Sequence, residues 1–387
     1  MNSRKIKIAA IGTLVLFFMA TSGAIVKNSA SSFSSTTKLF QVMQIIRAHY
    51  VEDVPAETLI TGAVKGMINA LNDPHSTYMD KERYSKFMVE TEGSFGGVGI
   101  VIGVKDKLLT VVAPIEGTPG EKAGIKSGDQ IIKIDGQDTT GMAVDQAVSR
   151  IRGPVGSRVT LTIKRDGQDE QDYVLTRSNI QIKTVHGRML EDKIGYIRIS
   201  MFNENTGSDF RKQLNELKSQ GMMAVVLDLR DNPGGLLTES VKVASNFVPQ
   251  GPVVSVISKS GDKMTHSSDL RTASYPLAVL INGGSASASE IIAGAVQDTG
   301  AGTLIGTKTY GKGSVQSVMR LDSETAVKLT VARYYTPKAR SIDGVGIEPD
   351  LKVENPVINR EEVRNTGNMN IRDLQLEKAL EVLKEKM

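Results

Sequence analysis

The feature of this sequence that most restricts its fold is an alternation of apolar runs and amphipathic stretches after Asn179. The apolar runs predict β-strands at residues 194–201, 224–229, 253–257 and 277–281. The amphipathic stretches predict helices at residues 207–220, 237–247 and 287–297. Strands and helices in this order form a mixed sheet covered by helices, and two more strands are predicted at residues 315–321 and 326–335.

The residues before this alternation show two other patterns. Apolar side chains recur at helical spacing from Leu39 to Asn72-Asp73-Pro74, where proline ends the helix, and a short helix is predicted at residues 81–90. From Gly93 the sequence changes to short runs of Gly, Val and Ile separated by turns, which predicts a small β domain with one helix at residues 143–151.

We therefore predict a mixed α+β fold in five segments. They are a signal peptide or membrane anchor with a Ser- and Thr-rich linker (residues 1–35), a helical N-terminal region (36–92), the small β domain (93–178), the α/β core (179–354) and a C-terminal helical tail (355–387). A chain of 387 residues is long enough for two or three domains.

The N-terminus has the pattern of a segment that enters a membrane. Arg4, Lys5 and Lys7 precede an uncharged run over residues 8–26, which as a helix could just cross a bilayer core of about 30 Å. The small residues Ser22-Gly23-Ala24 have the spacing that a signal peptidase prefers. A signal peptide and an uncleaved anchor both place the rest of the chain outside the cytoplasm, because the positive flank stays inside. We expect the periplasm or the outer face of the cytoplasmic membrane.

Composition excludes several kinds of site. Without cysteine, the chain has no disulfide, no thiolate nucleophile and no cysteine-based zinc site. The four histidines are widely scattered, so we expect no metal, and no cofactor motif is present. Lys and Arg do not gather in one stripe, so we expect no nucleic-acid partner.

A glycine-rich turn, Gly96-Gly97-Val98-Gly99-Ile100, opens the small β domain. Its N–H groups can converge on an anion, and the strand beside it can accept an extended peptide, although a tight turn in a barrel is the plain alternative. Together with residues 127–136, this stretch resembles a PDZ domain. The resemblance implies that Gly97, Val98, Gly99 and Ile100 bind a free C-terminus. Arg152 is a further candidate for substrate sensing, or else an exposed structural arginine.

The chemistry concentrates where an apolar strand, two glycines and small residues lead into a helix at residues 282–290. A side chain at that turn sits at a helix N-terminus, whose N–H groups and dipole favour negative charge, so the turn can serve as an oxyanion hole. Ser287 and Glu290 also form a capping box, which needs no catalysis. These residues alone do not choose among Ser285, Ser287 and Ser289.

Lys312 lies between two glycines, which indicates that its backbone is pressed close to another part of the protein, and we take it as the candidate base. If this region is extended, Lys312, Ser314 and Gln316 share one face of a strand. Residues 306–312 also approach a phosphate-binding loop, but Gly313 stands where that loop needs Ser or Thr, and a strand-like run follows. A serine–histidine–aspartate site using His75 is weaker still, since Asp73-Pro74-His75 has the pattern of a helix-terminating turn.

Three motifs together resemble the carboxyl-terminal processing, or tail-specific, protease family. They are Gly284-Ser285-Ala286-Ser287-Ala288-Ser289-Glu290, Tyr310-Gly311-Lys312-Gly313-Ser314-Val315-Gln316 and Leu227-Asp228-Leu229-Arg230-Asp231-Asn232-Pro233-Gly234-Gly235. The similarity covers nearly the whole chain after the membrane segment. It implies a PDZ-like domain at residues 93–178 and a mixed-sheet α/β serine protease core at residues 179–354.

By this resemblance Ser287 is the nucleophile, Lys312 the general base and Gln316 the amide that supports the base. The N–H of Ala288 and one from Gly234 or Gly235 would form the oxyanion hole. A lysine acts as a base only when it is neutral, and its ordinary pKa is about 10.4, so the folded site must lower that pKa by roughly two to three units. Burial without a carboxylate partner has this effect.

The function that follows is an extracytoplasmic endopeptidase that cleaves proteins or peptides near free C-termini, with the PDZ-like domain capturing the tail. An activating partner is a further expectation, and the apolar faces of the first and last helices could pair between copies of the chain. The second class of function is a PDZ binding scaffold on an inactive hydrolase-like core. The intact set of Ser287, Lys312 and Gln316 favours the enzyme.

Overall fold

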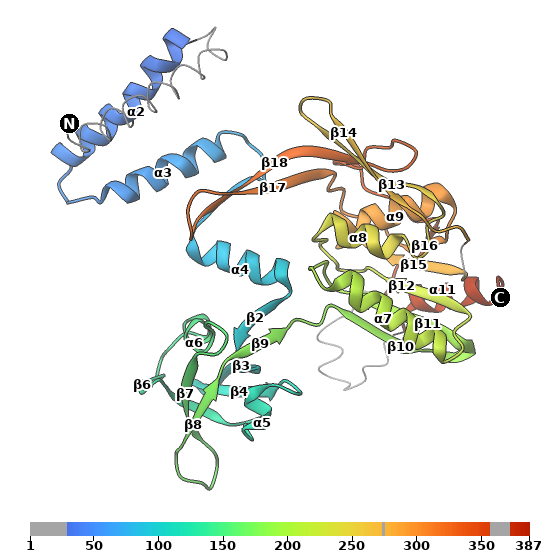
Figure 1. Ribbon diagram of the computed structural model, residues 1–387, viewed down its shortest axis with the longest axis horizontal. Coiled ribbons are helices and arrows are strands. Elements are labelled where there is room, and N and C mark those ends of the chain that lie inside the picture. Colours follow the sequence, from blue (N-terminus) through green and yellow to red (C-terminus); the bar gives the residue numbers. More distant parts are fainter. Residues whose placement is uncertain (1–28, 273–274, 357–371) are drawn as a thin grey trace, which may run out of the picture. The chain divides into compact units, whose positions relative to one another are not determined.

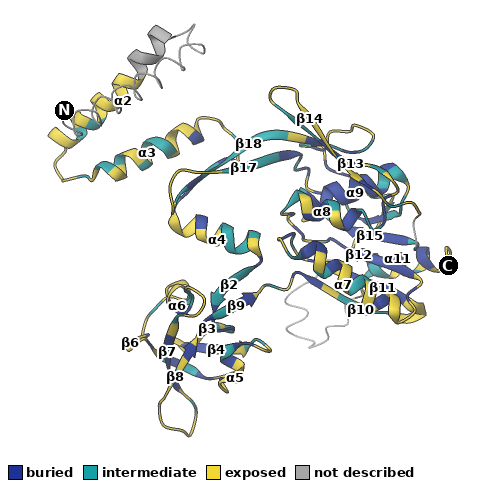
Figure 2. Cartoon of the chain, viewed as in Figure 1, coloured by how far each residue is buried: buried dark blue, intermediate teal, exposed yellow. Residues whose placement is uncertain are grey.

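The chain forms two compact units, residues 1–78 and 79–387, in a computed structural model that describes residues 29–272, 275–356 and 372–387 (Figure 1). In the first unit, helix α2 (Ser29–His49) is followed by α3 (Ala56–Asn69). Helix α2 begins within the predicted linker, so these Ser- and Thr-rich residues are helical. Both helices carry exposed apolar side chains, such as Phe40 at 59% and Ile60 at 54% (Figure 2).

The segment that we expect to enter the membrane, residues 8–26, lies outside the described residues. Among the residues that the structure does describe, no helix has both the length and the apolar character needed to cross a bilayer.

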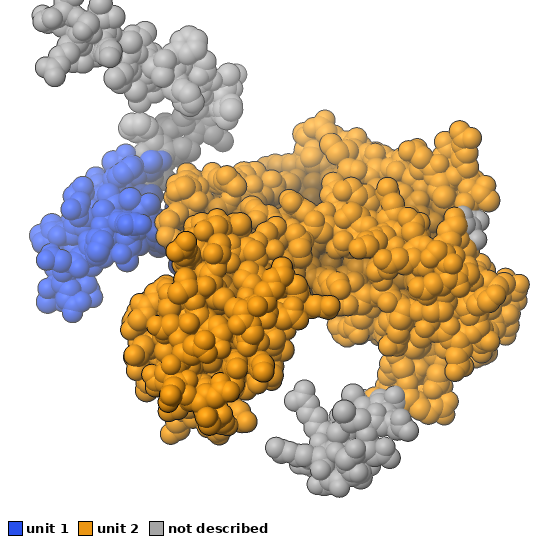
Figure 3. Space-filling view, turned by 60° about the horizontal axis from the view of Figure 1, so that its bottom comes forward, with its two compact units in different colours: residues 1–78 blue, residues 79–387 orange. Residues whose placement is uncertain are grey.

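Figure 3 shows the two units in different colours, with the division after residue 78. Strand β1 (Thr77–Met79) spans this division in the sequence, and helix α4 (Lys81–Glu92) is the first helix of the second unit. The Asp80 side chain accepts the Arg83 N–H at 3.1 Å, which caps the start of α4. The helix ends at Gly93, whose φ of 67° is a left-handed conformation that glycine adopts without strain.

The small β domain is an antiparallel sheet with its own core. The strand order is β3 (Ile100–Lys105), β4 (Leu108–Pro114), β5 (Gln130–Ile134), β7 (Arg158–Lys164) and β8 (Gln171–Thr176), with β6 (Gln137–Asp138) paired to β5. Helix α6 (Val144–Ile151) confirms the helix predicted at residues 143–151, and the short helix α5 (Pro119–Lys122) is one that the sequence pattern does not predict. The chain enters through β2 (Ser94–Gly97) and leaves through β9 (Ser178–Gln181), and these two strands pair with each other.

The core of the second unit is built on a mixed sheet. Its order is β10 (Val185–Met189), β11 (Ile194–Ile199), β12 (Ala224–Asp228), β15 (Leu277–Ile281), β16 (Thr303–Gly306) and β19 (Leu351–Lys352). A short turn of 3-10 helix, η2 (Glu191–Lys193), joins the antiparallel pair β10 and β11, and β11 through β19 pair in parallel.

Helices cover both faces of this sheet, because alternate side chains of each strand point to opposite faces. Helices α7 (Thr206–Ser219), α8 (Leu237–Ala244) and α9 (Ala288–Thr299) share a core with Val225 and Leu227 of β12. Helix α11 (Leu374–Lys384) packs on the other face with Ala224 and Val226. The apolar face of this last helix is therefore covered by its own sheet and is not available to a second copy.

A second, antiparallel sheet contains β17 (Ser314–Arg320), β18 (Ala326–Tyr335), β13 (Gly251–Ser258) and β14 (Lys263–Ser268). Strand β18 pairs with β17 on one side and with β13 on the other. The prediction that residues 253–257 continue the main sheet is wrong, because the hydrogen bonds of β13 go to β14 and β18. The two strands predicted at residues 315–321 and 326–335 are confirmed as β17 and β18.

Candidate active site

Ser287 stands in the turn between strand β15 and helix α9, at the residue that caps the N-terminus of the helix. Its backbone has a φ of 54° and a ψ of −110°, a conformation that a residue with a side chain rarely adopts. Such strain persists where the surroundings hold the backbone in place, and it concentrates at functional sites. The adjacent helix N-terminus offers main-chain N–H groups to any negative charge that develops there.

The two neighbouring serines, Ser285 and Ser289, are buried and each donates a hydrogen bond to a main-chain carbonyl. Ser285 is fully buried, and its Oγ donates to the Leu229 carbonyl at 2.7 Å. Ser289 is also fully buried, and its Oγ donates to the Asn232 carbonyl at 3.0 Å. Ser287 is only half-buried, so it is the one of the three that a substrate can reach.

Glu290 is fully buried at the start of α9 and accepts four hydrogen bonds. Its Oε2 accepts the N–H groups of Ser287 and Lys312, each at 2.8 Å. Its Oε1 accepts the Gly311 N–H at 2.7 Å and the Thr309 hydroxyl at 2.6 Å. The sequence pattern identifies Glu290 only as a helix cap, whereas the same carboxylate also holds the loop that carries the candidate base.

The loop that carries Lys312 uses its main-chain N–H groups within the protein, which opposes a nucleotide site. The N–H groups of Gly311 and Lys312, which would face a phosphate, are bonded to the Glu290 carboxylate. A phosphate that bound to these N–H groups would be repelled by the negative Glu290 carboxylate. Gly313 is followed by strand β17 instead of the helix that a phosphate-binding loop requires.

Lys312 is half-buried and lies directly before β17. In that strand, the Gln316 Nε2 donates to Ser314 Oγ at 2.9 Å and to Thr330 Oγ1 at 3.2 Å. Ser314 and Gln316 therefore lie on one face of β17, as the alternation of a strand predicts. The two hydroxyl groups fix the direction of the Gln316 amide beside the base loop.

Tyr334 also reaches this centre, and no pattern in the sequence indicates it. Its hydroxyl donates to the main-chain carbonyl of Lys312 and lies near the Ser287 side chain. The ring is buried, with 2% of its surface exposed. Burial raises the pKa of Tyr334 well above its ordinary value, and the nearby charge of Glu290 raises that pKa further.

Gly234 lies against the turn between β15 and α9 that carries Ser287, which we call the nucleophile turn because Ser287 is the candidate nucleophile. A Cβ atom built on Gly234 would stand 2.8 Å from the Ser287 Cβ and 3.0 Å from the Ala288 nitrogen. With a φ of 102°, this close approach of two backbones requires glycine. The structure thus brings together the candidate residues on either side of the proposed oxyanion hole.

Main-chain hydrogen bonds distinguish Gly234 from Gly235 as the candidate donor to the oxyanion hole. The Gly234 N–H donates to Asn232 Oδ1 at 2.9 Å. The Phe202 N–H donates to the Gly234 carbonyl at 2.9 Å, and the Phe202 carbonyl accepts the Leu236 N–H at 2.8 Å. In this parallel bridge the N–H and carbonyl of Gly235 point away from Phe202, because main-chain groups alternate in direction along an extended strand.

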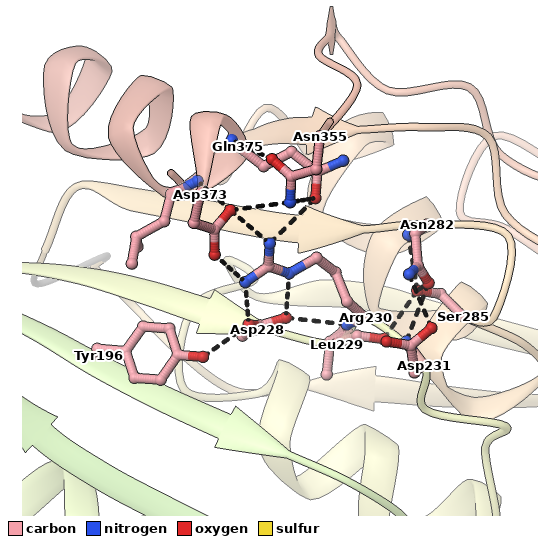
Figure 4. Close-up of polar contacts among 11 residues, drawn as sticks. Tyr196, Asp228, Leu229, Arg230, Asp231, Asn282, Ser285, Asn355, Asp373 and Gln375 are labelled. Atoms are coloured by element: carbon pink, nitrogen blue, oxygen red, sulfur yellow. Dashed lines mark hydrogen bonds and ion pairs between the residues drawn. The ribbon is translucent and has the colours of Figure 1, made fainter. Parts of the chain in front are cut away.

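An ion-pair network is centred on Arg230, the first residue of the segment 230–235 (Figure 4). We call this segment the oxyanion loop, because it carries the candidate donors Gly234 and Gly235. Arg230 donates to both oxygens of the fully buried Asp228, at 2.9 and 2.6 Å. It also donates to both oxygens of Asp373, at 2.8 and 2.9 Å. Burial opposes the charge of Arg230, but the bonds to the two carboxylates raise its pKa overall. Tyr196 adds a hydrogen bond to Asp228 at 2.7 Å.

A second set of contacts joins the oxyanion loop to the nucleophile turn (Figure 4). The Asp231 N–H donates to Asn282 Oδ1, and Asn282 Nδ2 donates back to Asp231 Oδ1, both at 2.9 Å. The Ser285 Oγ in turn accepts the Asn282 N–H at 3.0 Å. The ends of β12 and β15 are therefore held side by side, which fixes the approach of Gly234 to Ser287.

The glycine-rich turn of the β domain leads into an edge strand. Strand β3 stands at one end of the strand order, and helix α6 contacts it. The Gly120 N–H donates to the Val98 carbonyl at 2.7 Å, and Thr118 Oγ1 donates to the Gly99 carbonyl at 3.0 Å. These bonds hold the turn formed by Gly97, Val98, Gly99 and Ile100 in place.

Arg152 is half-buried and is less exposed than the structural alternative assumes. Its guanidinium lies 3.9 Å from the centre of the Phe95 ring, and burial lowers its pKa. The next residue, Gly153, donates its N–H to the Gly96 carbonyl at 3.1 Å. Arg152 is thus held next to the glycine-rich turn.

The other candidate sites have little support in the described residues. Asp73 accepts the His75 main-chain N–H at 3.0 Å and the Ser76 hydroxyl at 2.6 Å, which is the turn that the sequence pattern predicts. Within the described ranges, no three His, Asp or Glu side chains gather as a metal site would require.

Family models match three parts of the chain. Peptidase family S41 matches residues 193–353, a PDZ domain matches residues 110–165, and the activating protease CtpB N-terminal domain matches residues 19–83.

Individual proteins match over most of the chain. A carboxy-terminal-processing protease of Bartonella bacilliformis is 42% identical over 338 residues, covering 85% of this chain and 77% of that protein. The carboxy-terminal processing protease CtpA of Bacillus subtilis is 38% identical over 346 residues, covering 89% and 74%. Among solved structures, a photosystem II D1 C-terminal processing protease is 29% identical, with a TM-score of 0.48 and coverage of 86% of this chain and 97% of that one.

Proposed function

Because the chain belongs to the carboxy-terminal processing proteases of peptidase family S41, and is therefore a serine peptidase that acts on proteins, we propose that it cleaves them near their C-termini with Ser287 as nucleophile and Lys312 as general base. One observation carries this proposal. The main-chain nitrogens of Ser287 and Lys312 both lie 2.8 Å from Glu290 Oε2, so they are no farther apart than twice 2.8 Å. Main chains this close allow the Ser287 Oγ and the Lys312 Nζ to come within hydrogen-bond reach of each other, as a serine–lysine pair requires.

In the proposed reaction, the neutral Lys312 Nζ accepts the proton of Ser287 Oγ, and Oγ forms a bond to the peptide carbonyl carbon. The Lys312 ammonium then gives this proton to the leaving amine as the peptide C–N bond breaks. Water hydrolyses the acyl-serine by the same route. Gln316 supports Lys312 through an amide, which orients the base without adding a negative charge that would keep it protonated.

The oxyanion hole is proposed to consist of the N–H groups of Ala288 and Gly235. Ala288 is the first residue of α9, where main-chain N–H groups lack a partner within the helix. Of the two glycines, Gly234 already donates its N–H to Asn232, which favours Gly235 as the second donor. Two donors aimed at the developing charge are the usual requirement for acyl transfer.

We further propose that the β domain binds the substrate tail. An extended peptide can add to the open edge of β3, with its terminal carboxylate at the turn of Gly97, Val98, Gly99 and Ile100. Arg152, next to this turn, supplies a positive charge on the same side. This division of labour would restrict cleavage to proteins that present a free C-terminus.

The enzyme is proposed to act outside the cytoplasm, because of the basic flank and uncharged run at residues 4–26. A fusion of the full chain to alkaline phosphatase, which is active only outside the cytoplasm, checks this. An inactive fusion of normal abundance would contradict it. Self-association through the exposed apolar side chains of α2, and an activating partner, remain proposals of the same kind.

The decisive experiment uses an unstructured polypeptide with an apolar C-terminus, prepared with a free and with an amidated tail. Wild type should cut the free form faster, and Ser287→Ala and Lys312→Ala should both be folded and inactive. Lys308→Ala is the matched control, since Lys308 pairs with Glu348 on the surface. Equal cleavage by Lys312→Ala would place the base elsewhere. A wild type that never cuts would favour the inactive binding scaffold.

A further inference from the structure

Tyr334 enters the catalytic centre from a different sheet than the nucleophile does. It lies in strand β18 and pairs with Val256 of β13, in the antiparallel sheet. Ser287 belongs to the turn after β15, in the mixed sheet. The Tyr334 side chain crosses from one sheet to the other, and its hydroxyl meets the Lys312 carbonyl and the Ser287 side chain there.

The chemistry of a buried phenol fixes what this hydroxyl can do. A buried tyrosine hydroxyl needs a hydrogen-bond partner, and its single proton goes to the Lys312 carbonyl. Because its pKa is raised, the hydroxyl keeps its proton at neutral pH, so it acts as a donor to Lys312 and not as a competing base.

We propose that Tyr334 is a positioning residue that sets Ser287 and Lys312 at the separation which proton transfer requires. This inference rests on the proposed serine–lysine mechanism. Glu290 holds the N–H of Lys312 and Tyr334 holds its carbonyl, so the two peptide groups on either side of the base are fixed. The same two side chains also reach Ser287, because Glu290 accepts its N–H and the Tyr334 hydroxyl lies near its side chain. The nucleophile and the base are thereby linked through one pair of buried groups.

The position could instead need only the aromatic ring, as part of the core. Tyr334 belongs to the main apolar cluster of the second unit, and a phenylalanine would fill nearly the same space. The hydroxyl is the part that this inference concerns. Removing it leaves the Lys312 carbonyl without this donor and frees the base loop to shift.

The test compares Tyr334→Phe with Tyr335→Phe in the full chain. Tyr335 is the next residue of β18 and is only half-buried, so its variant controls for loss of a hydroxyl from the same strand. We expect Tyr334→Phe to lower kcat by about ten- to a hundred-fold, with KM changed by no more than about two-fold. Labelling of Ser287 by a fluorophosphonate should slow by a similar factor. Tyr335→Phe should match wild type, and the melting temperatures of all three should be close.

A kcat within about two-fold of wild type in folded Tyr334→Phe would overturn the inference, and so would an increase in kcat. If Tyr334→Phe does not fold, 4-aminophenylalanine at position 334 restores a donor. Cleavage by that protein supports the inference, and a folded but inactive protein contradicts it. Failure of the underlying mechanism looks different, because Ser287→Ala would then still cut and still react with the fluorophosphonate.

Discussion

At the scale of single residues, the fully buried carboxylate of Glu290 needs a full set of hydrogen-bond donors around it. A fully buried carboxylate is strongly unfavourable unless donors surround it. Here four donors do so, three of them main-chain N–H groups. The bonds to Ser287 and Lys312 mean that neither residue can move without leaving part of a buried charge unsatisfied. The glutamate that caps this helix therefore also holds the two candidate catalytic residues together.

Gly235 is a residue at which even a single added methyl group should not be tolerated. Its φ is 135°, and a Cβ atom there would overlap the Phe202 carbonyl oxygen. We expect Gly235→Ala to displace the oxyanion loop and to lower kcat by about a hundred-fold or more, as loss of an oxyanion donor does. Peptidase assays with urea unfolding of the same preparations check this.

Gly221→Ala is the control for this prediction. Gly221 also has a positive φ, of 85°, but nothing lies within 4 Å of the added carbon. The variant should lose only about 1–2 kcal/mol of stability through backbone strain and should keep its activity. Normal cleavage by Gly235→Ala would show that this glycine lies outside the oxyanion hole.

Single residues also show how far the sequence alone can lead. Ser287 and Lys312 lie in motifs that resemble those of a known protease family, and only this resemblance assigns their roles, because the physics of the turn leaves three serines open. The structure separates the three by burial, which depends on contacts of Ser285 and Ser289 with the loop after β12. Tyr334 has no local signal, because its place in the site depends on how β18 pairs with β13 and β17.

At the scale of elements, helix α11 is tied to the oxyanion loop by a charge network. Asp373 caps this helix through the Leu376 N–H at 3.1 Å, and it also pairs with Arg230. Burial of Asp373 would raise its pKa, but the bonds from Arg230, Asn355 and Leu376 outweigh burial and hold that pKa below its ordinary value. The last helix of the chain therefore steadies the loop that carries Gly234 and Gly235.

The sign of this shift gives a pH-dependent prediction for Asp373→Asn. A carboxyl group with a lowered folded pKa adds stability above its unfolded pKa of about 3.9, and that stability is lost as the pH falls through the folded pKa. We expect Asp373→Asn to be less stable than wild type by about 1 kcal/mol at pH 7, because an ion pair with a partly exposed carboxylate contributes about that much. The loss should not be larger, because Asn can still cap the helix. The difference should shrink as the pH falls below about 3.9 and should disappear only once the pH is below the lowered folded pKa of Asp373.

Urea unfolding at pH 7, 5 and 3 measures the difference for Asp373→Asn. Glu381→Gln is the matched control, since Glu381 lies in the same helix and pairs with Lys378 at the surface. That variant should stay within about 0.5 kcal/mol of wild type at pH 7. A deficit of Asp373→Asn that is equal at all three pH values would mean that the carboxylate charge is not what holds the helix.

Elements also mark the limit of pattern reasoning about the fold. Apolar runs predict β12, β13 and β15 equally well, and chain order places β13 between the other two. Pairing decides otherwise, because β13 forms a hairpin with β14 and its second edge is taken by β18. Such pairing depends on residues about 80 positions away in the sequence, which no local period can report.

At the scale of the whole second unit, the β domain is joined to the core at a small junction around Gly93. The Ile182 N–H donates to the Gly93 carbonyl at 2.8 Å, directly beside the paired strands β2 and β9. Glu204 of the core donates its N–H to Thr91 at 2.9 Å, and Asn205 Nδ2 donates to the Glu92 carbonyl at 3.2 Å. Any influence of tail binding on the catalytic centre through direct contacts of the chain must include this junction.

Gly93→Ala tests whether that influence exists. A Cβ atom at Gly93 would overlap the side-chain amide of Asn203, which is fully buried, and the φ of 67° adds strain. We expect the junction to shift, so that the preference for free over amidated tails falls by about five-fold or more while cleavage of the amidated form is nearly unchanged. Gly124→Ala is the control, since Gly124 lies in the β domain with a φ of 80° and open space around it. If folded Gly93→Ala keeps the full preference, the β domain only captures the tail, and the catalytic centre acts independently of it.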